Sequence, residues 1–292
     1  MYNLNLQYQN LLKDILNKGE KDDKSTSLLG TQIFYNLEEG FPILNTKTSL
    51  LQQIITELKW SLKGNTNIKY LIDNNCNTWN NIAYEYYINN YNKLKLNFKH
   101  IENIDNYLYK SIFKDKLLSK EEYIQSIKSN EIINEDFNFS DLWGNLGPIY
   151  TKQLKSQIKK LLEWVKSPQT LDYVVNLYNF DDIFYAAIKP SYISFQCYIS
   201  NNKLNLVWNQ NKSNIITELP NNILFYSLLL SLLCEEGNFK PGNLIGSFGK
   251  VYFENKEMQK LKTNFNKQIF NFSKIKLDNV NIKEGEFDFT LI

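Results

Sequence analysis

The stretch at residues 189–226 constrains the fold of this chain more than any other. From Tyr192 its side chains alternate between two faces, with Tyr192, Ser194, Gln196 and Tyr198 on one and Ile193, Phe195, Cys197 and Ile199 on the other. A period of two predicts a β-strand. The turn-forming residues Ser200-Asn201-Asn202 follow, and a second alternating run contains Leu204, Leu206 and Trp208. We therefore expect a hairpin.

A helix is expected directly after this hairpin. The pair Leu219-Pro220 breaks the alternation, and Asn221 or Asn222 can cap a helix whose apolar run is Ile223 to Leu233. This run is too short to span a bilayer, which needs about 20 apolar residues, so it indicates a core helix and no membrane segment. The sequence thus predicts a hairpin, a polar loop and a buried helix in this order.

Composition excludes several classes of function. The 292 residues carry a net charge of only +2, which gives no general attraction to nucleic acid. Arg is absent from the sequence, so every permanent cation is a Lys. His100 is the only His, which argues against a His-based metal site or a Ser-His-Asp triad. The cysteines are few and scattered: Cys76, Cys197 and Cys234. They predict neither a disulfide framework nor a metal site, and they indicate a reducing, cytoplasmic setting.

Several ordered motifs resemble those of the thymidylate synthase family. The most specific in the amino-terminal half combines Glu57-Leu58-Lys59-Trp60 with Lys63-Gly64-Asn65-Thr66-Asn67-Ile68. The others are Glu39-Gly40-Phe41-Pro42, Asn145-Leu146-Gly147-Pro148-Ile149-Tyr150, Phe195-Gln196-Cys197-Tyr198 and Leu219-Pro220-Asn221-Asn222-Ile223. The resemblance covers most of the chain outside residues 84–142.

This resemblance implies a fold, a reaction and partners. The fold is an α/β three-layer arrangement with a twisted mixed sheet flanked by helices, in a single domain at 1–292 with a surface insertion at about 84–142. The family reaction methylates dUMP to dTMP with 5,10-methylenetetrahydrofolate and needs no metal. The family also forms homodimers through the sheet face that its helices leave open, so we expect a homodimer and a dUMP-like nucleotide, with no nucleic acid or membrane partner.

The resemblance also implies site residues. The catalytic positions are Ser191 (the nucleophile position), Glu57 and Tyr252. The substrate-binding positions are Lys24, Gln210, Asn211, Lys212, Asn214, Asn222 and Lys250. Among these, Asn222 keeps the position that pairs with the pyrimidine edge. The cofactor-binding positions are Lys47 and Trp79.

The reactive residues depart from the family pattern. Ser191 stands where the family has its nucleophilic Cys, and Tyr192 where it has a His. A Ser hydroxyl ionises far less readily than a thiol and needs a base. The four phosphate-binding Arg positions are filled by Lys24, Asn211, Leu171 and Asp172. These changes predict that catalysis is impaired or lost.

Three alternatives stay open from the sequence. The chain can be a non-catalytic structural or assembly subunit of a larger complex that keeps the fold. It can be a working enzyme on an altered nucleotide, with Lys212 and Lys250 forming a new anion site. It can also be the product of a decaying gene.

Overall fold

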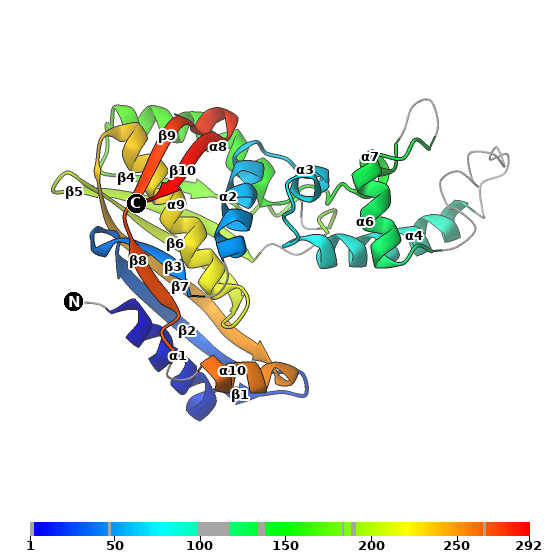
Figure 1. The fold of residues 1–292 in the computed structure, drawn as a ribbon, viewed down its shortest axis with the longest axis horizontal. Coiled ribbons are helices and arrows are strands. Elements are labelled where there is room, and N and C mark those ends of the chain that lie inside the picture. The colour runs from blue at the N-terminus through cyan, green and yellow to red at the C-terminus, as the bar shows by residue number, and fades with distance from the viewer. Residues whose placement is uncertain are drawn as a thin grey trace.

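The computed structural model describes residues 3–45, 48–98, 117–133, 138–182, 184–187, 191–264 and 267–292. Its centre is a six-stranded sheet in the order β1-β2-β7-β6-β5-β4 (Figure 1). These strands are β1 (Glu20–Lys21), β2 (Ser25–Asn36), β4 (Asp172–Asn176), β5 (Tyr192–Ser200), β6 (Lys203–Asn214) and β7 (Lys240–Glu254). Only β6 and β7 pair in parallel, so the sheet is mixed as expected.

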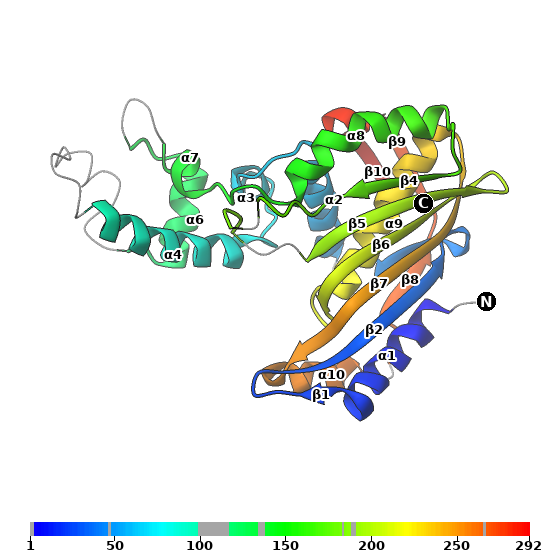
Figure 2. The same cartoon turned by 180° about the vertical axis from the view of Figure 1, so that it is seen from behind.

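Helices cover one face of this sheet. The central one, α9 (Leu219–Gly237), packs directly on β6 and β7 and connects them, as a parallel pair requires. On α9 pack α2 (Thr48–Leu62) and α8 (Tyr150–Lys166). Figure 2 shows the opposite face, which no described helix covers. The layers are therefore the sheet, α9 and an outer set of helices, as the resemblance implies.

Two small antiparallel pairs complete the main body. They are β3 (Phe41–Leu44) with β8 (Phe270–Ser273), and β9 (Ile275–Asn281) with β10 (Glu286–Leu291). Both β3 and β9 contact α9, so these pairs extend the layer over that helix. The remaining helical elements here are α3 (Lys69–Asp73), α10 (Met258–Asn264) and the short 3-10 turns Leu37–Glu39, Asn255–Glu257 and Ile282–Glu284.

The predicted hairpin is confirmed, with one correction. Asn201 and Asn202 form its turn, both with positive φ, and β5 pairs with β6 along its length. The register shifts between Tyr192 and Ser194, which makes Ile193 the extra residue of a β-bulge. The expected placement of Tyr192 beside Ser194 and Gln196 was therefore wrong. The bulge turns Tyr192 towards the core face, opposite Gln210.

Helix α9 begins earlier than the apolar pattern indicates. Pro220 lies in its first turn, where a missing N–H costs nothing, so Leu219-Pro220 starts the helix instead of preceding it. Asn222 is buried inside the helix, and the expected cap at Asn221 or Asn222 was wrong. Nearly every side chain of α9 is buried because neighbours surround the helix on all sides.

Helix α1 (Leu4–Lys18) closes the long edge of β2. The side-chain amide of Gln7 donates to the Phe34 carbonyl oxygen at 2.6 Å and accepts from the Phe34 N–H at 2.9 Å. The amide thus mimics a neighbouring strand at a point where β1 no longer reaches. An unpaired edge attracts other strands, so this contact both anchors α1 and protects the sheet.

Three helices form an arm that extends away from the sheet (Figure 1): α4 (Asn80–Phe98), α6 (Lys120–Ser129) and α7 (Phe139–Trp143). The arm has an aromatic core of its own, in which Tyr87 packs face to face on Tyr123 and edge-on to Trp143. Tyr123 also donates its hydroxyl to the Trp143 carbonyl oxygen. The arm contains described residues of the expected insertion, while His100 lies outside the described residues. Within the described part of the chain, no helix is long and apolar enough to cross a bilayer.

Candidate functional site

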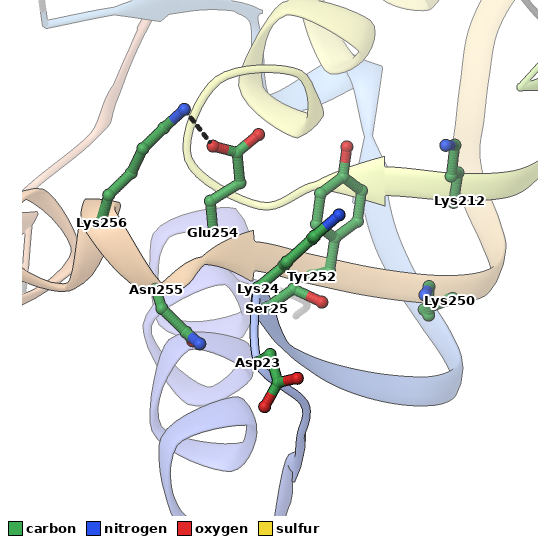
Figure 3. Close-up of a pocket in the computed structure, with 9 residues that line it drawn as sticks. All are labelled: Asp23, Lys24, Ser25, Lys212, Lys250, Tyr252, Glu254, Asn255 and Lys256. Carbon is green, nitrogen blue, oxygen red and sulfur yellow. Dashed lines mark ion pairs between the residues drawn. The ribbon is translucent and has the colours of Figure 1, made fainter.

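Two adjoining cavities lie at the end of the sheet where β6 and β7 finish. We call the first the lysine cavity. It measures about 560 Å³ and is lined by Asp23, Lys24, Ser25, Lys212, Lys250, Tyr252, Glu254, Asn255 and Lys256 (Figure 3). We call the second the glutamate cavity. It measures about 510 Å³, and its lining includes Glu57, Glu218 and Glu254. Glu254 belongs to both linings, so the two cavities are neighbours.

The lysine cavity gathers positive charge from three strands or strand ends. Lys212 of β6 and Lys250 of β7 are partners in the parallel register, and Lys24 precedes β2. No ion pair joins these three lysines to any described residue, whereas Lys256 pairs with Glu254 (Figure 3). Free ammonium groups beside one another favour an anionic ligand, but each lysine offers a point charge without the two-pronged geometry of Arg.

A tight loop fixes Lys24. The Asp22 carboxylate accepts the backbone N–H groups of Lys24 and Ser25, both at 2.7 Å. These hydrogen bonds stabilise the ionised form and lower the pKa of Asp22.

Glu57 lies deep in the glutamate cavity, on α2, with only 8% of its surface exposed. Its Oε1 accepts the Trp79 indole N–H at 3.0 Å. Burial raises the pKa of Glu57, although hydrogen bonds from Trp79, Thr78 and Tyr150 act in the opposite direction. The sequence expectation that Glu57 and Trp79 share one site is consistent with this contact.

A chain of buried hydrogen bonds forms the floor of the glutamate cavity. The Trp208 indole N–H and the Asn222 amide N–H both donate to Oε1 of Gln210, each at 3.0 Å. The Tyr192 hydroxyl contacts Oδ1 of Asn222 at 3.0 Å. The ring of Tyr192 lies 4.8 Å from that of Tyr150, and burial raises its pKa well above the usual value.

The side chain of Asn214 is hydrogen-bonded within the protein and lines neither cavity. Its side-chain oxygen accepts the N–H groups of Ile216 and Thr217, and its amide donates to the Glu257 carboxylate at 2.8 Å. Its backbone N–H donates to Glu218, whose pKa is raised by burial. The expected substrate contact at Asn214 is therefore absent from the lining, because this side chain shapes the loop that leads into α9.

The other expected positions divide between the cavities and elsewhere. Ser191, Gln210 and Asn222 line the glutamate cavity, and no cysteine does. Cys76 is 1% exposed, with its thiol 3.3 Å from the Thr78 hydroxyl, while Cys197 and Cys234 are buried in the core. Asn211 is exposed and lines neither cavity, and Lys47 lies outside the described residues.

Comparison with known proteins identifies the family. The family model for thymidylate synthase matches residues 6–291. A thymidylate synthase of Mycoplasma mobile is 31% identical over 303 aligned positions, covering 96% of each chain. One from the Aster yellows witches'-broom phytoplasma is 32% identical over 88% of this chain and 83% of its own, and one from Mesoplasma florum is 30% identical over 97% and 91%.

The chain belongs to the thymidylate synthase family. Within the described residues no group of His, Cys, Asp or Glu side chains is arranged to hold a metal ion. The glutamate cavity is also lined by three residues that the sequence motifs do not mark as site residues, Tyr192, Glu218 and Glu254. The bulge that brings Tyr192 into this cavity has no signal in the alternating pattern.

Proposed function

We propose that this member of the thymidylate synthase family does not methylate dUMP at a significant rate. The observation that supports this is the lining of the glutamate cavity, where Ser191 occupies the nucleophile position and no cysteine is present. A thiol with a pKa near 8.5 can supply a thiolate once neighbours lower that value. A hydroxyl needs a base, and no His imidazole is present among the residues that line this cavity.

The anion site supports the same proposal. Of the four positions that resemble the family's phosphate-binding arginines, only Lys24 carries a positive charge towards the lysine cavity. Leu171 and Asp172 are both exposed at the start of β4, and an aspartate repels phosphate. Each charged hydrogen bond contributes roughly 1.5–3 kcal/mol, so losing several weakens nucleotide binding by orders of magnitude. Lys212 and Lys250 offset part of this loss.

The glutamate cavity has an apolar wall that would suit 5,10-methylenetetrahydrofolate, which would supply the one-carbon unit. Trp79, Ile82 and Phe225 line the glutamate cavity and would hold a planar ring.

We further propose a cytoplasmic homodimer that associates through the open sheet face.

The test is dTMP formation from dUMP and 5,10-methylenetetrahydrofolate at high concentrations of the purified chain. We expect no turnover above the blank, and we expect that Ser191→Cys alone does not restore it because the phosphate contacts are still missing. A cysteine-containing family member is the positive control. Turnover by the unmodified chain would overturn the proposal, and robust rescue by Ser191→Cys would overturn its phosphate argument.

A second candidate is an assembly subunit that keeps the fold without the chemistry. The observation that favours it is a surface loop with three strongly exposed aromatic side chains, of which Phe184 is 83% exposed; the others are Phe180 and Tyr185. The loop adjoins the arm, since the Tyr86 hydroxyl donates to the Tyr185 carbonyl oxygen. A partner retained by the wild type and released by serine substitution of all three residues would support this role.

A further inference from the structure

The hydrogen-bonded chain on the floor of the glutamate cavity has a direction that one residue fixes. An indole N–H can only donate, so the Gln210 atom that Trp208 contacts at 3.0 Å must be the amide oxygen. The Asn222 atom that contacts the same oxygen must be its amide nitrogen. The Asn222 oxygen therefore faces the Tyr192 hydroxyl, which donates to it.

With this direction, the amide oxygen and both amide hydrogens of Asn222 have partners within the protein. One amide hydrogen is directed to Gln210 and the other to the Ser213 hydroxyl, at 3.5 Å, while Tyr192 occupies the oxygen. Tyr192 is held in this position by its bulge and by ring contacts to Tyr150 and Tyr226. Asn222 consequently offers the cavity no free donor.

Gln210, in contrast to Asn222, keeps a donor without a partner in the described part of the chain. Both lone pairs of its amide oxygen are taken, by Trp208 and Asn222. Its Nε2 has no hydrogen-bond partner among the described residues, although the side chain is 98% buried and lines the glutamate cavity. Because Gln210 lines the cavity, this N–H group is a donor open to the cavity, and a ligand atom that accepts its hydrogen bond can take the place of water there.

We propose that Gln210, and not Asn222, is the residue that recognises a ligand in the glutamate cavity, by donating from Nε2 to a carbonyl oxygen or ring nitrogen. Tyr192 is the positioning residue that withdraws Asn222 from the ligand. Trp79, Phe225 and Tyr192 supply flat walls, so the ligand is a planar heterocycle with an acceptor on its edge. The inference concerns recognition and holds whether or not dUMP is methylated.

The first test is a titration of the full-length chain, labelled with ¹⁵N, with 2′-deoxyuridine. This probe carries carbonyl acceptors but no phosphate, so the lysine cavity does not contribute. We expect the side-chain NH₂ signals of Gln210 to shift and those of Asn222 to stay in place. A shift confined to Asn222, or no shift of Gln210 up to the solubility limit of the probe, would overturn the proposal.

Variants give a second, independent readout by calorimetry. Gln210→Glu replaces the free donor with an oxygen of the same size, and we expect at least a roughly ten-fold loss of affinity for 2′-deoxyuridine. The matched control is Gln125→Glu at an exposed position of α6 in the arm, which should leave affinity unchanged. In Tyr192→Phe, which frees the Asn222 oxygen, the Asn222 signals should begin to respond to the probe. Equal affinity in Gln210→Glu and wild type would refute the assignment, and the titration of wild type stands if that variant does not fold.

Discussion

At the residue scale, Glu57 links the geometry of the glutamate cavity to a measurable pH dependence. Its carboxylate is buried beside Trp79, and desolvation raises its pKa above the reference value of 4.5. The folded state thus holds this proton more tightly than the unfolded chain does. The contribution of Glu57 to the free energy of unfolding therefore falls as pH rises above about 4.5.

The variant Glu57→Gln should remove this dependence while keeping an oxygen for the Trp79 indole. We expect its stability relative to wild type to increase from about pH 5 to about pH 8, by up to about 1.4 kcal/mol for each unit of pKa difference between the folded and unfolded states. Urea unfolding at several pH values measures this. Glu85→Gln, at an exposed site of α4, is the control. A stability difference that stays constant with pH would show that burial does not raise the pKa of Glu57.

Single residues also mark the limit of prediction for the site. Spaced motifs assigned Glu57 and Trp79 to the predicted site, but the hydrogen bond that joins them could not be predicted from the motifs. The hydrogen bonds of Asn222 could not be predicted, because one of them comes from the hydroxyl of Tyr192. That contact requires one bulged residue in β5, and a bulge changes the face of a side chain without altering the pattern of residue types.

At the scale of elements, local sequence patterns predicted a helix or strand correctly where tertiary packing did not change the local preference. The hairpin of β5 and β6 followed from alternation and from the two asparagines of its turn, which tolerate positive φ. The start of α9 was misplaced because Pro220 both ends strands and begins helices, and only the packing on β6 and β7 decides between these roles. The contact of α1 with the edge of β2 joins residues 27 positions apart and has no local signal.

This edge contact makes a prediction for α1. Gln7→Ala removes both hydrogen bonds to the Phe34 backbone, and we expect a loss of about 1–3 kcal/mol in the free energy of unfolding. It should also increase aggregation because the β2 edge becomes available to other strands. Urea unfolding and light scattering measure the two effects. Lys13→Ala, at an exposed position of the same helix, should change neither.

At the scale of the whole molecule, the open face of the sheet has one largely apolar row. Neighbouring residues along it come from five strands, with Gln196 as its polar member; the others are Val174, Val207, Ile245 and Phe34. No described helix covers this face, as Figure 2 shows. Apolar side chains presented together on a flat surface mark an association surface.

We therefore expect the chain to have twice its 34.5-kDa mass by light scattering at micromolar concentration. Val207→Lys places an ammonium group in the middle of the apolar row, where a partner's copy of the same face would bury it, so this variant should be monomeric. The variant Ile132→Lys is the matched control. Ile132 is 80% exposed and lies between α6 and α7 of the arm, so this variant should leave the mass unchanged. A wild type that stays monomeric, or a Val207→Lys variant that stays dimeric, would show that the open face is not the interface. A dimer that dissociates only in Val207→Lys would mean that the association surface has been kept while the cavity residues have changed.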